Sequence, residues 1–235
     1  MDRVKSEATD RGWQRLRATK LYDLLAAAPL MLWLAFGVNS QSALLIRRAV
    51  ELYSGNIDLN NSLQFLALLG SISVNVSMIY FLIVRTKPIA RLKGVLPRIT
   101  AFVGSFFNTS ILMLPTAKLT LPAQIVSNLL IFGGCCGALF VLSRLGRSFA
   151  MLAEARELKF SGPYALARHP LYAFELSISF GLMMQFQQPW ASMIMAAGFF
   201  VMYARSTFEE RVLEERFPQY GQYRSRTARF IPGLF

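Results

Sequence analysis

Apolar residues in this chain fall into long blocks that are separated by short polar segments. Four blocks run for about 20 residues with at most one charged side chain each, which is the length of helix that crosses a bilayer. They are Leu21–Val38, Leu63–Val84, Ile99–Ala117 and Leu119–Ser143. Asp23 is the single charge among them. Each block therefore predicts a transmembrane helix.

A fifth apolar block, residues 170–204, is too long for one upright helix at about 1.5 Å per residue. Its middle reads Gln-Phe-Gln-Gln-Pro at residues 185–189, and polar amides before a proline favour a turn. We interpret the block as a helical hairpin of two short spans, Leu171–Phe186 and Pro189–Ala204. The predicted fold is an all-α, polytopic transmembrane bundle of about six spans, followed by a cytoplasmic C-terminal helical segment.

The charges support this fold and set an expected orientation. Of the 235 residues 54% are apolar, 16% are charged, and the net charge is +12. Lys and Arg concentrate in cytoplasmic loops of membrane proteins. With both termini inside, 22 of the 25 Lys and Arg residues are cytoplasmic, and Arg47, Arg48 and Lys118 are not. The surplus positive charge is then explained by anionic lipid headgroups rather than by nucleic acid.

The location follows from this topology: an integral membrane protein of a bacterial inner membrane or the endoplasmic reticulum, with cytoplasmic N- and C-termini. The two cysteines, Cys135 and Cys136, are adjacent in an apolar block. Neighbouring cysteines rarely form a disulfide, and two make no metal site by themselves. We expect membrane packing from them and predict no metal site.

Two polar segments after the fourth span carry the candidate chemistry, and the six-span topology places both on the cytoplasmic side. In residues 158–172, Gly162-Pro163 predicts a turn and Pro170 predicts a helix start. This loop brings Tyr164, Arg168 and His169 to the hairpin. A histidine at a helix start is more often structural, but a cation and two tyrosines accompany this one.

The second segment, residues 205–217, continues the last span as a helix. Arg205 and Glu209 are spaced i, i+4 and share a face. Charged residues at the end of a span usually face solvent, and we accept this for Glu214 and Glu215. Glu209 and Glu210 follow directly on the membrane boundary, where the first segment must also pass.

The order of these pieces resembles the isoprenylcysteine carboxyl methyltransferase and phospholipid methyltransferase families. The resemblance rests on G-x-Y-x-x-x-R-H-P-x-Y at residues 162–172, then the hairpin, then E-E-x-x-L-x-x-x-F at residues 209–217. It covers roughly residues 144–235. We therefore predict a methyltransferase core in 144–235, and a basic segment with four transmembrane helices in 1–143.

The resemblance implies S-adenosylmethionine as methyl donor and a lipid-like substrate that enters from the bilayer. Arg205 matches the arginine that faces the substrate carboxylate. The family usually has a histidine where this chain has Arg156. By matching positions, the donor pocket is lined by Leu158, Tyr164, Arg168, His169, Pro170, Tyr172, Glu209 and Glu210.

The side-chain chemistry is compatible with this reaction. Carboxylates can accept charge-assisted hydrogen bonds from the donor's ammonium and hydroxyl groups, and aromatic rings suit its adenine and sulfonium. A carboxylate acceptor needs orientation by Arg205, whereas an amine acceptor needs a base such as Glu209 or Glu175. We expect Arg205 and Glu209 to be catalytic, and Arg205 and Glu175 to bind substrate. Glu175 alternatively forms an ion pair with Arg168 or Arg205.

Two other functions compete with methyl transfer. One is an NADPH-dependent sterol or isoprenoid reductase, since some of these enzymes resemble the same membrane core. The loops here are short for the phosphates of a dinucleotide. The other is a non-enzymatic membrane scaffold, against which the complete Arg168-His169-Pro170 and Glu209-Glu210 motifs argue. The methyl acceptor and the oligomeric state stay open.

Overall fold

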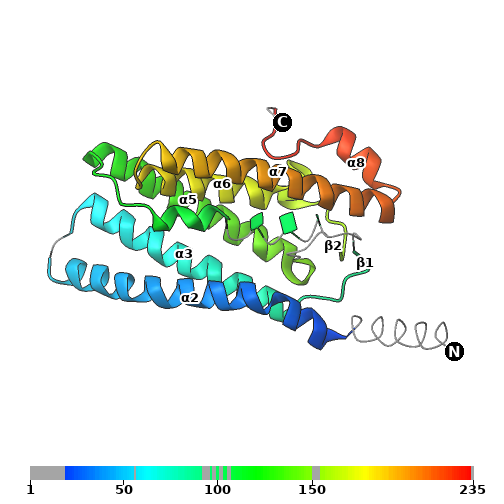
Figure 1. Ribbon diagram of the computed structural model, residues 1–235, viewed down its shortest axis with the longest axis horizontal. Coiled ribbons are helices and arrows are strands. Elements are labelled where there is room, and N and C mark those ends of the chain that lie inside the picture. The colour runs from blue at the N-terminus through cyan, green and yellow to red at the C-terminus, as the bar shows by residue number, and fades with distance from the viewer. Residues whose placement is uncertain are drawn as a thin grey trace.

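The computed structural model describes residues 19–55, 57–91, 96, 99, 100, 103, 104, 107–149 and 154–233. Long helices dominate this part of the chain, as the all-α prediction requires (Figure 1). The α-helices are α2 (Lys20–Tyr53), α3 (Leu59–Val84), α5 (Leu121–Leu145), α6 (Pro170–Met184), α7 (Trp190–Arg216) and α8 (Tyr220–Arg226). Three short 3-10 helices are η1 (Phe107–Met113), η2 (Gly146–Ser148) and η3 (Gly162–Ala165). Two-residue strands β1 (Ala90–Arg91) and β2 (Glu154–Ala155) pair antiparallel.

Local sequence explains where the long helices begin and end. The Thr19 hydroxyl accepts a hydrogen bond from the Tyr22 amide at 3.2 Å, and the Asp58 carboxylate accepts one from the Asn61 amide at 2.7 Å. These side chains satisfy amides that a helix N-terminus leaves without partners. Helix α5 ends at Leu145, and the residue that follows, Gly146, has a φ of 54°, which suits glycine.

Three helices are long and apolar enough to cross a membrane: α2, α3 and α5, the last extended through Ser148. They agree with the first, second and fourth predicted spans. Helix α6 is a shorter apolar helix. The third predicted span, Ile99–Ala117, is not one continuous α-helix in the residues described, because Phe107–Met113 is a 3-10 helix and residues 114–117 are not helical. Pro115 lacks an amide hydrogen and disfavours a helix there. The basic segment before Thr19 lies outside the described residues.

The two consecutive helices predicted for the fifth apolar block are present, although neither is among the three helices long and apolar enough to cross a membrane. Helix α6 ends at Met184 and α7 begins at Trp190, so the turn occupies the predicted Gln-Phe-Gln-Gln-Pro stretch. The side-chain amide of Gln185 donates a hydrogen bond to the Ser127 hydroxyl at 2.8 Å, and Phe186 forms an isolated antiparallel β-bridge with Thr116. In a membrane, apolar side chains contact lipid as favourably as they contact another helix, so polar contacts of this kind help to hold helices together.

Helices α5 and α6 approach closely along a line of glycines. A Cβ atom on Gly134 would lie 2.7 Å from Ile178 Cγ1, and one on Gly181 would lie 2.7 Å from the Ser127 carbonyl oxygen. Small residues let helix backbones approach in this way in membrane proteins. Through this contact α5 fixes the position of α6, whose first residues belong to the candidate site.

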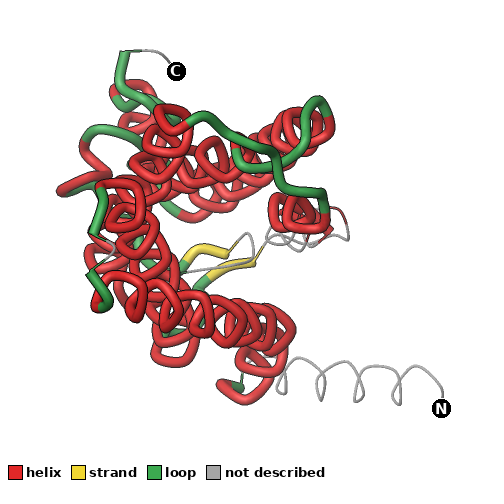
Figure 2. The backbone as a smooth tube through the Cα atoms, turned by 90° about the vertical axis from the view of Figure 1, so that its left-hand side faces the viewer, coloured by secondary structure: helices red, strands yellow, loops and turns green. Residues whose placement is uncertain are grey.

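One end of the bundle gathers the polar segments, on the right of Figure 1: the start of α2, the ends of α3 and α5, the start of α6 and the end of α7. Strands β1 and β2 lie there too, on the inner side of the arc that the helices form in Figure 2. A buried ion triad joins three of these segments. Asp23 pairs with Arg85 at 2.8 Å and with Arg156 at 3.2 Å.

Candidate active site

The loop before α6 places two basic side chains at the first turn of that helix. Gly162 has a φ of 63°, which favours glycine, and it opens the 3-10 turn η3. Pro170 begins α6, and His169 is the residue before the helix. Proline suits the first helical position because the amide it lacks would have no partner there. The glycine turn and the proline therefore fix the positions of Arg168 and His169 at the start of α6.

The C-terminal segment pairs with this loop along its backbone. The Arg168 amide donates to the Ala228 carbonyl at 2.8 Å, and the His169 amide donates to the Arg229 carbonyl at 2.9 Å. Ala167 and Ala228 form an isolated parallel bridge. We call residues 227–230 the C-terminal strap. It closes one side of the site.

Glu210 is the ionic centre that holds the strap. Its carboxylate lies 2.8 Å from Arg168 Nε, 3.2 Å from His169 Nε2 and 3.0 Å from an Arg229 guanidinium nitrogen. Burial alone would raise the pKa of Glu210, but the hydrogen bonds from His169 and Arg168 outweigh it and lower the pKa to about 2. Arg168 also donates to the carbonyls of Arg224 and Thr227. Both oxygens of Glu210 are thus used within the protein.

Glu209 is arranged differently, although it is the next residue. Its Oε1 accepts hydrogen bonds from the Tyr172 hydroxyl at 2.7 Å and from Arg205 Nε at 3.0 Å. Its Oε2 lies 3.7 Å from His169 Nδ1, which is too long for a hydrogen bond. The Glu209 side chain is 20% exposed, against 3% for Glu210. Glu209 is therefore the carboxylate that can meet a ligand.

Aromatic rings lie beside these carboxylates. His169 stacks on Tyr172 with ring centroids 5.3 Å apart and planes 6° apart, and Phe230 of the strap lies 5.9 Å from His169. The Arg229 guanidinium lies 4.6 Å from the centre of the Tyr203 ring. The site thus combines a partly open carboxylate with several aromatic faces.

Helix α8 adds tyrosines to the same region. The Tyr223 hydroxyl donates to the Tyr164 carbonyl at 2.6 Å, and burial raises the pKa of Tyr223 to about 12, so it stays protonated at neutral pH. Within the described part of the chain, the buried Tyr220 hydroxyl has no hydrogen-bond partner. A buried hydroxyl without a partner costs free energy, so it points to a ligand or water in this place.

The structure brings most of the predicted site residues together. Tyr172, His169, Arg205 and Glu209 interact directly, and Pro170 begins α6 next to His169. Leu158 lies in the loop between β2 and η3. Glu175 lies on α6 close enough to Arg205 and Glu209 to interact electrostatically. In the described residues Arg168 pairs with Glu210 and Arg205 with Glu209.

Arg156, where the sequence departs from the family pattern, is buried and pairs with Asp23 of α2. Sequence reasoning did not foresee this bond, nor the role of Arg229. A lone carboxylate at the start of an apolar helix was the available signal for the first. The second had none, because Arg229 and Glu210 are distant in sequence.

Comparison with known proteins supports the resemblance. Residues 112–220 match the family model described as phospholipid methyltransferase, which confirms the predicted resemblance for this range. The match begins earlier than residue 144, so it takes in α5 as well as the hairpin.

Two curated bacterial proteins are similar over shorter stretches. The cobalt-zinc-cadmium resistance protein CzcN of Cupriavidus metallidurans is 35% identical over 114 residues, covering 46% of this chain and 52% of that protein. The nickel-cobalt-cadmium resistance protein NccN of Alcaligenes xylosoxydans xylosoxydans is 34% identical over 82 residues, covering 34% of this chain and 38% of that protein. The chain thus spans about half the length of these relatives, or less.

Proposed function

We propose that this protein transfers a methyl group from S-adenosylmethionine to a small lipid-like substrate at the end of the bundle that carries Glu209. The observation that carries the proposal is the partly exposed Glu209 carboxylate, held by Tyr172 and Arg205 beside aromatic rings. It lies within the range that matches the phospholipid methyltransferase model. An isoprenylcysteine-type carboxylate and a lipid amine are both compatible acceptors.

The residues present fit the donor. Its ammonium and ribose hydroxyls are hydrogen-bond donors, and Glu209 Oε2 can accept such a bond. Its carboxylate needs a donor, and the buried Tyr220 hydroxyl has no partner among the described residues. The rings of His169, Tyr172 and Phe230 suit adenine. When bound, S-adenosylmethionine supplies an electrophilic methyl group on a sulfonium.

The chain's own residues then contribute orientation and exclusion of water. Arg205 lies 5.3 Å from the centre of the Tyr172 ring and pairs with Glu209, so its direction is fixed. A guanidinium held in this way can orient an acceptor carboxylate. For an amine acceptor, Glu175 or Glu209 would take the proton. The strap, fixed by Glu210, covers the site and limits the entry of water.

Exposed apolar side chains on α7 support entry of the substrate from the bilayer. The helix that leads to Arg205 exposes Phe199, Phe200 and Tyr203. The ring centroids of Phe199 and Tyr203 lie 6.3 and 6.5 Å from the ring centroid of Phe230. This apolar path ends beside the candidate site. A hydrophobic tail could lie along it while the reactive group reaches Arg205.

The two relatives are named for metal resistance, and the candidate site is compared with that role through its metal-ligating side chains. In the part of the chain that the structure describes, no group of three or more His, Cys, Asp or Glu residues gathers to hold a metal ion. The experiment that tests the proposal also distinguishes it from an NADPH-dependent reductase and from a non-enzymatic scaffold.

Calorimetric titration of S-adenosylhomocysteine into the detergent-purified protein tests the proposal, with NADPH as parallel ligand. We expect micromolar binding of S-adenosylhomocysteine that weakens at least tenfold in Glu209→Gln. Glu214→Gln, on the exposed side of the same helix, is the matched control and should bind normally. Binding of NADPH alone would favour the reductase, and binding of neither would favour the scaffold.

A further inference from the structure

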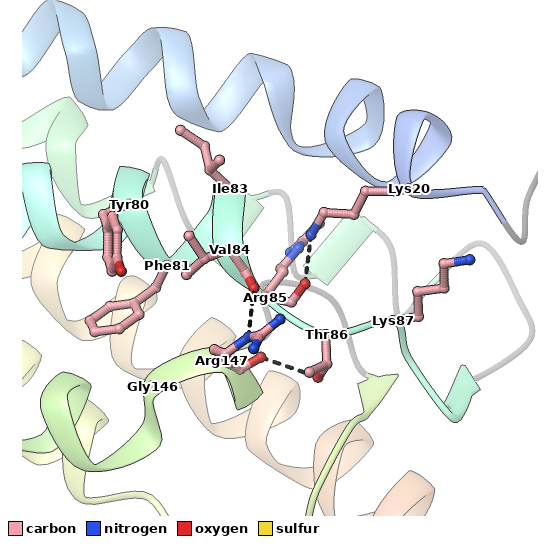
Figure 3. A pocket seen from close by; sticks show the side chains of 10 residues that line it. All are labelled: Lys20, Tyr80, Phe81, Ile83, Val84, Arg85, Thr86, Lys87, Gly146 and Arg147. Atoms are coloured by element: carbon pink, nitrogen blue, oxygen red, sulfur yellow. Dashed lines mark hydrogen bonds between the residues drawn. The ribbon is translucent and has the colours of Figure 1, made fainter.

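A cleft of about 740 Å³ lies at the polar end of the bundle (Figure 3). Its lining comes from the start of α2, the end of α3 with the residues after it, and η2. None of the residues around Glu209 and Glu210 lines it. The cleft therefore needs an explanation of its own.

Cations dominate the polar part of this lining: Lys20, Arg85, Lys87 and Arg147. Arg85 is engaged with Asp23, which also pairs with Arg156, so one carboxylate is shared by two arginines. Asp23 also attracts Lys20, but within the described residues no carboxylate pairs with Lys87 or Arg147, so this lining carries an excess of positive charge. A cationic sulfonium would be repelled here, whereas an anion would offset the excess positive charge.

Basic residues at the ends of membrane helices are common, and when they are scattered over the surface they do not indicate a specific binding site. Here they line one cleft, and hydrogen bonds to backbone carbonyls fix two of them, Arg147 and Lys20. Arg147 Nε donates to the Val84 carbonyl at 3.2 Å, and Lys20 Nζ donates to the Arg85 carbonyl at 2.5 Å. The Thr86 amide donates to the Arg147 carbonyl at 2.9 Å. Groups held in place lose less entropy when they bind a ligand.

The apolar part of the lining shows which kind of anion fits. Tyr80 and Ile83, on the last turns of α3, line the cleft and are 57% and 49% exposed. Helix α3 is long and apolar enough to cross a membrane. The cleft thus offers cations at the level of lipid headgroups, with apolar surface directly beside them.

We propose that this cleft binds the phosphate group of an anionic phospholipid, with Lys20, Lys87 and Arg147 around the phosphate and the acyl chains along Tyr80 and Ile83. The site is separate from methyl transfer. Its failure would leave the proposed function untouched, and the reverse also holds.

The test is the thermal unfolding midpoint of the full chain in a neutral detergent, titrated with short-chain phosphatidylglycerol. At about ten times Kd, we expect the midpoint to rise by roughly 3–6 °C. Phosphatidylcholine, which has the same chains and no net charge, should give a much smaller rise. An equal rise with phosphatidylcholine would show apolar binding only and overturn the proposal.

Substitutions locate the site. Lys87→Gln removes a side chain without a hydrogen bond or ion pair among the described residues and should weaken phosphatidylglycerol binding about fivefold. The double variant Lys87→Gln with Arg147→Gln should weaken binding about 25-fold. Replacing Arg147→Gln in that double variant by Arg147→Lys, which keeps the charge, should restore most of the affinity lost at position 147. Arg216→Gln, at an exposed position at the end of α7, is the matched control. Unchanged affinity in Lys87→Gln and in the double variant would overturn the site.

A last arm distinguishes a lipid from a soluble phosphate compound. Glycerol 3-phosphate offers a phosphate without chains, and we expect it to raise the midpoint far less than phosphatidylglycerol does. An equal rise at equal concentration would overturn the assignment to a lipid. The binding assay for S-adenosylhomocysteine, run on the same variants, should be unchanged.

Discussion

Replacing Glu210 by glutamine removes the charge that holds the C-terminal strap. Glu210 is buried and contacts Arg168, His169 and Arg229, so the substitution leaves these groups without their carboxylate. Removing one partner from a buried ionic cluster is costly because the remaining charges stay desolvated.

The lowered pKa of Glu210 gives the magnitude. Its folded-state pKa is about 2, against an ordinary value of 4.5. At about 1.4 kcal/mol per pKa unit, the difference corresponds to roughly 3 kcal/mol in favour of the folded, charged form. Because the folded pKa is the lower one, this stabilisation is present above about pH 4.5 and is lost as the pH falls toward 2.

Hydrogen exchange of the His169 amide, which donates to Arg229 of the strap, measures this effect locally. A loss of about 3 kcal/mol should speed its exchange about 100-fold in Glu210→Gln at neutral pH, and the difference from wild type should shrink below pH 4. Glu214→Gln is the control, since this exposed pair with Arg224 should contribute about 1 kcal/mol or less. Equal exchange in wild type and Glu210→Gln, or a difference that grows in acid, would refute the reasoning.

Other predictions concern packing, the site and the buried triad. Gly134→Ala should destabilise by about 1–3 kcal/mol in chemical unfolding because its Cβ meets α6, whereas the adjacent Gly133→Ala meets nothing within 4 Å and should be neutral or slightly stabilising. Tyr172→Phe, which loses the bond to Glu209, should weaken S-adenosylhomocysteine about tenfold in calorimetry; unchanged affinity would remove Tyr172 from the site. Asp23→Asn should cost about 3–5 kcal/mol in the same unfolding assay, since buried arginines lose their carboxylate.

The helical fold could be read from the sequence because the membrane imposes a simple rule on it. Blocks of about 20 apolar residues gave three helices that the structure confirms as long and apolar enough to span. The rule gave less at Ile99–Ala117, where the composition is apolar but the described residues include a 3-10 helix. Hydropathy measures the preference of side chains for lipid and does not indicate whether the backbone forms an α-helix or a 3-10 helix.

Contacts within the candidate site that depend on local sequence could be predicted, whereas contacts between distant segments could not. Proline and glycine placed the loop, and helical spacing placed Arg205 with Glu209. The partners of Glu210 and Asp23 lie on segments far away in the chain. No periodicity encodes such pairs, because they depend on how the helices pack.

The adjacent pair Glu209-Glu210 illustrates how neighbouring residues on a helix take different roles. Residues i and i+1 point in directions about 100° apart, so the two carboxylates cannot face the same surroundings. Glu210 faces the strap and is saturated, while Glu209 faces Tyr172 and Arg205 and keeps one oxygen available. Both substitutions should therefore weaken donor binding, but by different routes. Glu210→Gln should loosen the strap and the binding together, whereas Glu209→Gln should weaken binding while the strap keeps its slow hydrogen exchange.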